Sequence, residues 1–224
     1  MRVLPILFNT DMVRAILDER KTVTRRLPSK RIENKWDDYC DYVSAVATTG
    51  CTSFTEKQFY EQYPPYQPGD ILYVRETWQE CCRNTIHSQI VHNKYCFKAS
   101  VDNPIYGCID RECGQICNWK PSIHMPKEAA RIWLKVTDVQ VERLRDIDDE
   151  QAIKEGFEGE RCHCGGTAYA CTDCYNSGWI EPPFVGFMYT WNSTIKKSDL
   201  DRYGWDANPW VWVIEFERCE KPEK

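Results

Sequence analysis

Four cysteines in the last third of the chain form two close pairs. One residue separates Cys162 from Cys164, two separate Cys171 from Cys174, and two glycines follow the first pair. A pair at either spacing delivers two thiolates from one turn, and tetrahedral zinc needs four such soft ligands at one point. The glycines allow the backbone to fold tightly around a metal. The pattern predicts a structural zinc site with no open position for catalysis.

Other interpretations of these cysteines stay open. His163 lies between the first two thiols and could replace one of them, and a free-cysteine loop or a redox pair is the alternative to metal. A looser second group could hold another metal ion, although its fourth ligand is not identifiable; its members are Cys108, Cys113 and Cys117, with Cys81, Cys82 and Cys96 upstream. The alternative for this group is a set of partly buried free thiols, which pack as small hydrophobic side chains.

A basic run is the second chemical signal. Residues 14–31 hold seven basic and two acidic residues, whereas the whole chain of 224 residues has a net charge of −5. The basic residues are Arg14, Arg20, Lys21, Arg25, Arg26, Lys30 and Arg31. These residues could simply be the solvated end of a helix and the loop after it. The alternative, more specific hypothesis is that they form an anion-binding edge. Clustered Lys and Arg side chains are what a nucleic-acid backbone requires.

Composition limits the classes of protein. Hydrophobic residues make up 42% and charged residues 28% of the chain, which is typical of a folded globular domain. No apolar run approaches the roughly 20 residues that cross a bilayer. The short apolar stretch at residues 3–8 contains Pro5 and has no cleavage site after it, so we expect no secretory signal and a cytoplasmic location. In that reducing compartment, clustered cysteines favour metal over disulfides.

The elements that would position these groups can be read in order. Residues 3–8 predict a strand, Asn9 or Thr10 can cap a helix that ends near residues 19–21, and residues 22–24 are extended in character. Residues 28–65 look like an insertion with one short helix around residues 56–62. A strong strand is expected over residues 71–78 and a short one over residues 95–99. The prolines at 121 and 126 predict a rigid loop over residues 119–126.

The second half of the chain continues this pattern. Residues 129–142 predict a long strand, and Asp146 or Asp148 can cap a short helix through residues 152–155 that Gly156 ends. Residues 161–179 are a second insertion, which carries the predicted zinc knuckle. Residues 184–195 predict an amphipathic helix and residues 210–216 a closing strand. We expect one α+β domain over residues 1–224, built on a small curved sheet or barrel.

Several motifs together resemble a known family. They comprise Ile16-Leu17 with Arg20-Lys21-Thr22-x-Thr24-x-Arg26, residues 68–74, Ala152 with Glu155-Gly156, and residues 212–216. This set resembles the ASCH domain, a branch of the PUA-like superfamily. Residues 119–126 and 203–210 are similar to the subgroup common in phages and prophages. The resemblance covers roughly residues 1–27, 66–160 and 180–219, and it leaves out the two insertions.

The resemblance implies a PUA-like β-barrel with flanking helices and a cleft beside the Lys-Thr segment that binds RNA or a modified nucleoside. Some small ASCH proteins are N4-acetylcytidine amidohydrolases. Their proton acceptor, nucleophile and proton donor fall on Lys21, Thr24 and Glu155 here. A threonine nucleophile needs such a base, and a departing amine needs such an acid. Asp18-Glu19 replaces the glycine that is common before the motif.

Three functional classes therefore remain. We rank first a module that binds RNA, nucleic acid or a modified nucleoside, in which Arg20, Arg25 and Arg26 supply cations and Trp78 and Trp205 supply stacking rings. The alternative for both tryptophans is packing in the core. The second class is the amidohydrolase, for which the alternative is that Lys21 and Glu155 form an ion pair without function. The third is a protein-interaction module in which the zinc knuckle contacts a partner.

Overall fold

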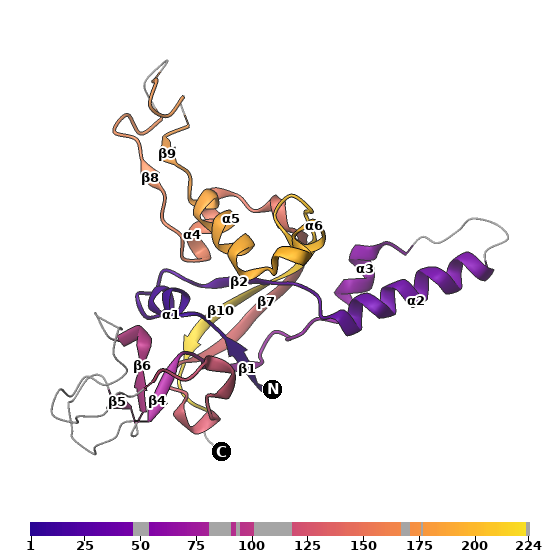
Figure 1. Ribbon diagram of the computed structural model, residues 1–224, viewed down its shortest axis with the longest axis horizontal. Helices are drawn as coiled ribbons and strands as arrows, with labels where there is room; N and C mark the ends of the chain where they lie inside the picture. The colour runs from indigo at the N-terminus through magenta and orange to yellow at the C-terminus, as the bar shows by residue number, and fades with distance from the viewer. Residues whose placement is uncertain are drawn as a thin grey trace. The chain divides into compact units, whose positions relative to one another are not determined.

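The computed structural model describes residues 1–46, 54–80, 91–92, 95–100, 118–166, 171–175 and 177–222 (Figure 1). It is a mixed α+β structure with one five-stranded sheet of order β1-β3-β7-β10-β2. Two small sheets, β4-β6-β5 and β8-β9, accompany it. Contacts divide the chain into two compact units, each made of separate segments.

The first unit contains Met1–Lys21, Pro68–Thr137 and Phe216–Lys224. Its elements are β1 (Val3–Leu7), α1 (Thr10–Leu17), β3 (Ile71–Arg75), β4 (Trp78–Glu80), β5 (Val91–His92), β6 (Tyr95–Phe97) and the start of β7 (Trp133–Arg143). Strand β1 runs parallel to β3, and β3 runs antiparallel to β7. Trp78, Tyr95, Phe97 and Trp133 belong to a buried cluster that forms its core.

The second unit contains Thr22–Gln67 and Asp138–Glu215. Its elements are β2 (Val23–Arg26), α2 (Lys30–Val46), α3 (Glu56–Glu61), α4 (Asp149–Lys154), β8 (Glu160–Arg161), β9 (Trp179–Glu181), α5 (Pro183–Thr194), α6 (Leu200–Tyr203) and most of β10 (Trp210–Cys219). Strand β2 pairs antiparallel with β10. Val23, Leu144, Phe187 and Val213 belong to its buried core.

Most predicted elements are confirmed. The strands at residues 3–8, 95–99, 129–142 and 210–216 and the helices at residues 10–21, 56–62, 152–155 and 184–195 all have counterparts, with shifted ends. The single strand expected over residues 71–78 is instead divided between β3 and β4, which belong to different sheets. Asn9 caps α1, and of the two candidate caps for α4 it is Asp148 that accepts a hydrogen bond, from the Gln151 amide. The described strands leave the main sheet open, with β1 and β2 at its edges, rather than closed into the expected barrel.

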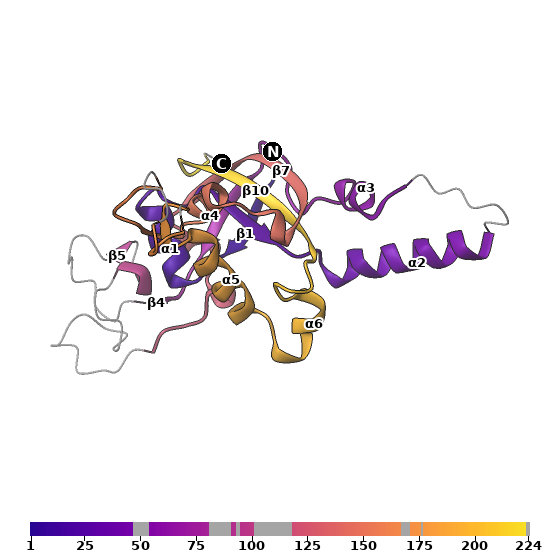
Figure 2. The same cartoon turned by 90° about the horizontal axis from the view of Figure 1, so that it is seen from above.

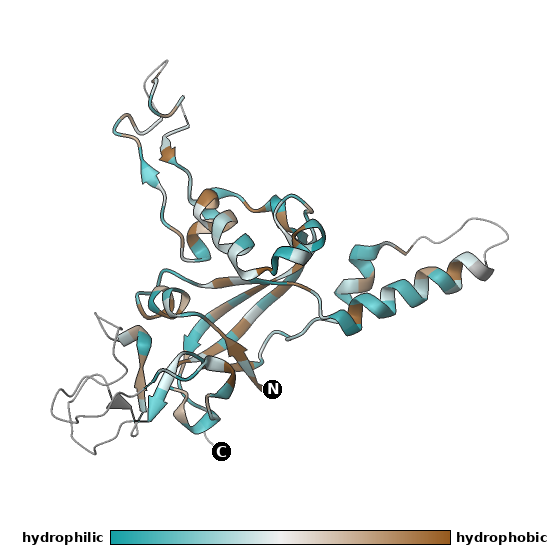
Figure 3. Ribbon diagram, in the orientation of Figure 1, coloured by the Kyte–Doolittle hydropathy of each residue, from teal (hydrophilic) through white to brown (hydrophobic). Residues whose placement is uncertain are grey.

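One long helix was not predicted. Residues 28–65 contain α2, a helix of 17 residues, before the expected short helix α3. Most residues of α2 are polar (Figure 3). The few apolar residues are therefore hard to recognise as a helical pattern in the sequence. Its aromatic residues Trp36 and Tyr39 nevertheless share one face and meet Phe59 of α3, with ring centroids 5.2 and 6.2 Å from that of Phe59. The two helices accordingly lie side by side in Figures 1 and 2.

None of the described helices combines the length and the apolar character that crossing a membrane would require.

Candidate functional site

Strand β2 presents alternate side chains to opposite faces of the sheet. Val23 packs with Val211 and Val213 of β10 in the core beside α4 and α5. Arg26 lies opposite Trp212 in the antiparallel register, and both line a cavity on the other face. Because successive strand residues alternate, Arg25 shares the face of Val23, and Thr24 shares the face of Arg26.

Arg25 is the centre of a buried polar cluster. Its side chain is fully buried and donates to Glu155 Oε1 at 3.3 Å, to Glu142 Oε2 at 3.3 Å and to Gln151 Oε1 at 2.7 Å. The guanidinium carbon lies 5.9 Å from the ring centroid of Phe187. A buried charge has to be paired and hydrogen-bonded, and these acceptors meet that need at the two Nη atoms, while the buried Nε has no partner among the described residues.

Helix α4 positions Glu155 at its C-terminal end. Asp148 Oδ1 accepts from the Gln151 amide at 2.7 Å, and Gly156 ends the helix with φ of +96°. The Thr22 amide donates to the Lys154 carbonyl at 2.8 Å, which ties the Lys-Thr segment to this helix end. The predicted residues Lys21, Thr24 and Glu155 are only 2%, 1% and 3% exposed.

Lys21 belongs to the first unit, where its Nζ lies 5.7 Å from the ring centroid of Phe8. Thr24 and Glu155 belong to the second unit. The convergence of the three side chains on one cleft stays a prediction.

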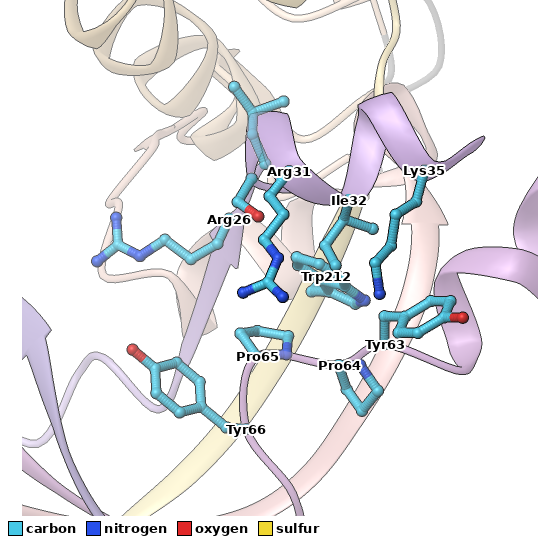
Figure 4. A pocket seen from close by; sticks show the side chains of 11 residues that line it. Arg26, Arg31, Ile32, Lys35, Tyr63, Pro64, Pro65, Tyr66 and Trp212 are labelled. Atoms are coloured by element: carbon cyan, nitrogen blue, oxygen red, sulfur yellow. The ribbon is translucent and has the colours of Figure 1, made fainter. Parts of the chain in front are cut away.

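A cavity of about 410 Å³ opens on the second unit beside the end of β2 (Figure 4). Its lining comes from β2 and the segment after it, from the first turns of α2, from the segment after α3, and from β10. The lining residues are Arg26, Leu27, Ser29, Arg31, Ile32, Lys35, Tyr63, Pro64, Pro65, Tyr66 and Trp212. This size suits a small ligand or one unit of a polymer.

The cavity combines cations with aromatic rings. Three of its lining residues are basic and three are aromatic, and none of the lining residues is acidic. Lys35 Nζ lies 4.6 Å from the ring centroid of Tyr63, within the range of a cation–π contact. Arg31 and Lys35 are exposed, and neither has an ion-pair partner within the described part of the chain.

Arg26 is the most enclosed cation of this cavity. Burial lowers the pKa of its guanidinium, and the charges of Glu155 and Tyr66 act in the opposite direction. Burial also raises the pKa of the Tyr66 hydroxyl, while Arg26 lowers it. Arg26 and Tyr66 thus each affect the pKa of the other, so the two side chains are close enough to interact electrostatically. Figure 4 shows the Tyr66 ring on the Arg26 side of the cavity.

Trp212 forms part of the cavity wall. Its side chain is 3% exposed, and its ring meets Tyr60 of α3 with centroids 6.4 Å apart. The buried indole Nε1 has no hydrogen-bond partner among the residues that the structure describes. An unpaired buried donor is destabilising, so an acceptor that reached it would be favoured.

The four predicted metal-ligating cysteines come together between β8 and β9. Their sulfur atoms all lie within 4.8 Å of one another, with Cys162 Sγ 3.7 Å from Cys171 Sγ and Cys164 Sγ 3.3 Å from Cys174 Sγ. Tetrahedral zinc with bonds of about 2.3 Å requires sulfur separations of about 3.8 Å. The donor set and its spacing fit a bound metal ion.

The backbone around these cysteines favours one thiolate. The Gly166 amide donates to Cys164 Sγ at 3.3 Å, and this bond, with the thiol of Cys174 next in effect, lowers the pKa of Cys164 to about 6. His163 is exposed; its Nδ1 lies 3.8 Å from Cys162 Sγ and 3.8 Å from Asp173 Oδ2. Cys162, His163 and Asp173 therefore form a second, more exposed group of possible ligands.

Arg20, Trp78 and Trp205, which the sequence also predicts to bind, are not among the residues that line the cavity. Arg20 pairs with Asp18 at 3.1 Å in the first unit, and Trp78 is 4% exposed in that unit's core. Trp205 packs at the edge of the second core, with its ring stacked on Phe184 at a centroid distance of 6.3 Å. Trp78 therefore packs in a core and Trp205 is half-buried against one, and the stacking role of both stays a prediction.

The cavity includes residues that the sequence analysis did not select. Lys35, Tyr63, Tyr66 and Trp212 were not assigned to a binding site. The sequence features that could have indicated this site are the Tyr-Pro-Pro-Tyr segment at residues 63–66 and the basic run before it. Of the cysteines proposed for a second metal site, Cys81, Cys82, Cys108, Cys113 and Cys117 lie outside the described residues, and Cys96 is buried in β6.

No protein-family model, no curated protein and no solved structure matches this chain.

Proposed function

We propose that this protein binds RNA or a modified nucleoside in the cavity beside the Lys-Thr segment. One observation carries the proposal: three cations and three aromatic rings line a cavity of about 410 Å³ that has no acidic lining residue. Nucleic-acid bases stack on aromatic side chains, and Lys and Arg neutralise phosphates. Arg26 connects this cavity with the Lys-Thr segment, because it is the last residue of that motif and also lines the cavity.

An N4-acetylcytidine amidohydrolase is less well supported. Hydrolysis requires Lys21, Thr24 and Glu155 to reach a substrate. All three are at most 3% exposed, and none of them lines the cavity. Glu155 accepts a hydrogen bond from Arg25, a contact that structural ion pairs also make. We therefore place binding ahead of catalysis.

We also propose that zinc is the ion held by Cys162, Cys164, Cys171 and Cys174. Four thiolates at tetrahedral spacing suit zinc better than magnesium or calcium, which prefer oxygen ligands. Such a site would be structural, because the segment between β8 and β9 is too short to form a core of its own. The relationship to the ASCH domain of the PUA-like superfamily is likewise a proposal, supported by the motifs around Lys21, Glu155 and Trp212.

Replacing the aromatic wall tests the binding proposal. We expect the intact chain to bind short single-stranded RNA at low salt, and Tyr66→Ala to weaken this binding about tenfold, because one stacked base contributes roughly 1–3 kcal/mol. Tyr189→Ala is the matched control, since Tyr189 is 66% exposed on α5 and lies outside the cavity. Titrations followed by fluorescence anisotropy measure both. Equal affinities for the two variants would contradict the proposal.

A further inference from the structure

The cavity has features that select among nucleic-acid ligands. We infer that it takes one phosphorylated nucleotide, either free or at the end of a single strand, in preference to an uncharged nucleoside. This inference rests on the proposed function and narrows it. Its argument comes from the cations, from the aromatic wall and from the charges along α2.

The cations call for a phosphate. Arg31 and Lys35 stand one turn apart on α2, and both point into the cavity in Figure 4. They lack ion-pair partners in the described part of the chain, so an anion displaces no carboxylate when it binds. Arginine can hold a phosphate with two parallel hydrogen bonds, and lysine adds a point charge. An uncharged nucleoside would use neither group fully.

Arg26 adds a third positive charge to the lining of the cavity. Its side chain is half-buried beside the cavity, so its charge is less screened by water than that of an exposed arginine, but the charge of Glu155 offsets part of it. Arg31 and Lys35 are therefore the cations that a phosphate meets without a competing ion-pair partner in the described part of the chain.

The rings complete a place for one base. Tyr63 and Tyr66 frame the Pro64-Pro65 segment on one side, and Trp212 lies on the other (Figure 4). The prolines fix the backbone that carries the tyrosines, which lowers the cost of ordering them around a ligand. The buried Trp212 N–H without a partner among the described residues favours a base that carries an acceptor on its edge.

The charges along α2 indicate that the strand ends here. Asp38 follows Lys35 by three residues and therefore lies on the same face, one turn further along. Asp37 and Asp41 add negative charge to the same stretch, and all three carboxylates are exposed. Phosphates that continued along α2 past Lys35 would be repelled, so a chain end fits better than the middle of a strand.

Calorimetric titrations with four ligands test this inference. They are cytidine, cytidine 5′-monophosphate, and one short single-stranded RNA with and without a terminal 5′-phosphate. We expect the phosphate to raise affinity about tenfold or more in both pairs, and the free nucleotide to compete with the phosphorylated RNA. The double variant Arg31→Gln with Lys35→Gln should abolish this advantage, whereas Lys197→Gln, an exposed lysine outside the cavity, should retain it.

The outcomes separate the two proposals. If RNA binds equally well with and without its terminal phosphate, or cytidine binds as tightly as its monophosphate, the inference fails while the binding function stands. If none of the four ligands binds, the inference fails, and the RNA-binding form of the proposed function fails with it. A ligand-binding site elsewhere would appear as phosphate-dependent binding that the Arg31 and Lys35 substitutions leave unchanged, and this would also overturn the inference.

Discussion

Arg25 brings a full positive charge into the interior of the second unit. Its acceptors Glu142, Gln151 and Glu155 come from β7, from α4 and from the residue that follows α4. A cation in this place links two elements that are distant from β2 in the sequence. Its contribution to folding is therefore separate from any contribution to ligand binding.

Removing this cation is expected to destabilise the protein strongly. Arg25→Leu leaves the buried Glu155 without the Arg25 guanidinium, and breaking such a pair costs about 3–5 kcal/mol. Urea unfolding followed by circular dichroism measures the free energy of unfolding. Arg20→Leu is the control, because its ion pair with Asp18 is exposed and contributes about 0–1 kcal/mol. Similar losses in the two variants would argue against a structural role for Arg25.

For single residues, the sequence indicated which side chains could carry chemistry, but not whether each of them would be buried or exposed in the fold. The motif drew attention to Lys21, Thr24, Arg25 and Glu155, and all four are buried. Nothing in the sequence of Arg25 and Arg26 tells which of them faces the core, because that depends on how β2 is registered on β10. The cavity residues Tyr63 and Trp212 were missed for the same reason, since only the folded chain brings them near Arg26.

Among the elements, α4 controls where Glu155 lies. The helix has six residues, and its first turn depends on the Asp148 cap. Asp148→Ala is expected to lower the free energy of unfolding by about 1 kcal/mol, because an amide of the first turn loses its acceptor. Asp148→Ser should recover most of this loss. Thermal unfolding of the three proteins measures it, and equal stability of the alanine and serine variants would contradict the capping role.

Two glycines of the second unit should respond in opposite ways to alanine. At Gly159 a Cβ atom would lie 2.6 Å from the Glu181 carbonyl oxygen and 2.6 Å from Pro183 Cδ, so Gly159→Ala should cost about 1–3 kcal/mol. Gly186 lies inside α5, and its nearest neighbour would be the Phe157 side chain at 3.3 Å. Gly186→Ala should be neutral or stabilising, because alanine favours helix. Chemical unfolding of both variants measures the difference.

The elements themselves were largely predictable. Caps and glycines bounded α1 and α4, and apolar runs predicted the main strands. Helix α2 was missed because its stabilisation comes from the contacts of Trp36 and Tyr39 with Phe59, more than 19 residues further along the chain. A mostly polar helix of this kind depends on tertiary packing, which local propensity does not report.

For the whole molecule, the four clustered cysteines lie outside the two buried clusters that form the cores. Neither core cluster includes Cys162, Cys164, Cys171 or Cys174. Removing metal with a chelator is therefore expected to raise amide hydrogen exchange between β8 and β9 while the cores stay protected. Purified protein should contain at least one zinc ion per chain before treatment, measured by elemental analysis.

Two results would contradict this expectation. Cooperative loss of protection in both cores after chelation would show that the metal supports the entire fold. Unchanged exchange between β8 and β9, in protein that had contained metal, would show that the four cysteines do not hold it. A variant with Cys162→Ser and Cys174→Ser should reproduce the effect of the chelator.

The opposite faces of β2 have a consequence for how this region can vary. A single-residue insertion or deletion between Lys21 and Arg25 would shift the strand by one position, which exchanges its inward and outward side chains. Arg26 would then enter the core, and Thr24 or its replacement would take a place beside α5. The two adjacent arginines are chemically identical, yet a change of spacing would disturb them more than most substitutions. The length of this segment is therefore more tightly constrained than its composition. If single residues were inserted at each position in turn, insertions between Lys21 and Arg25 should be among the least tolerated.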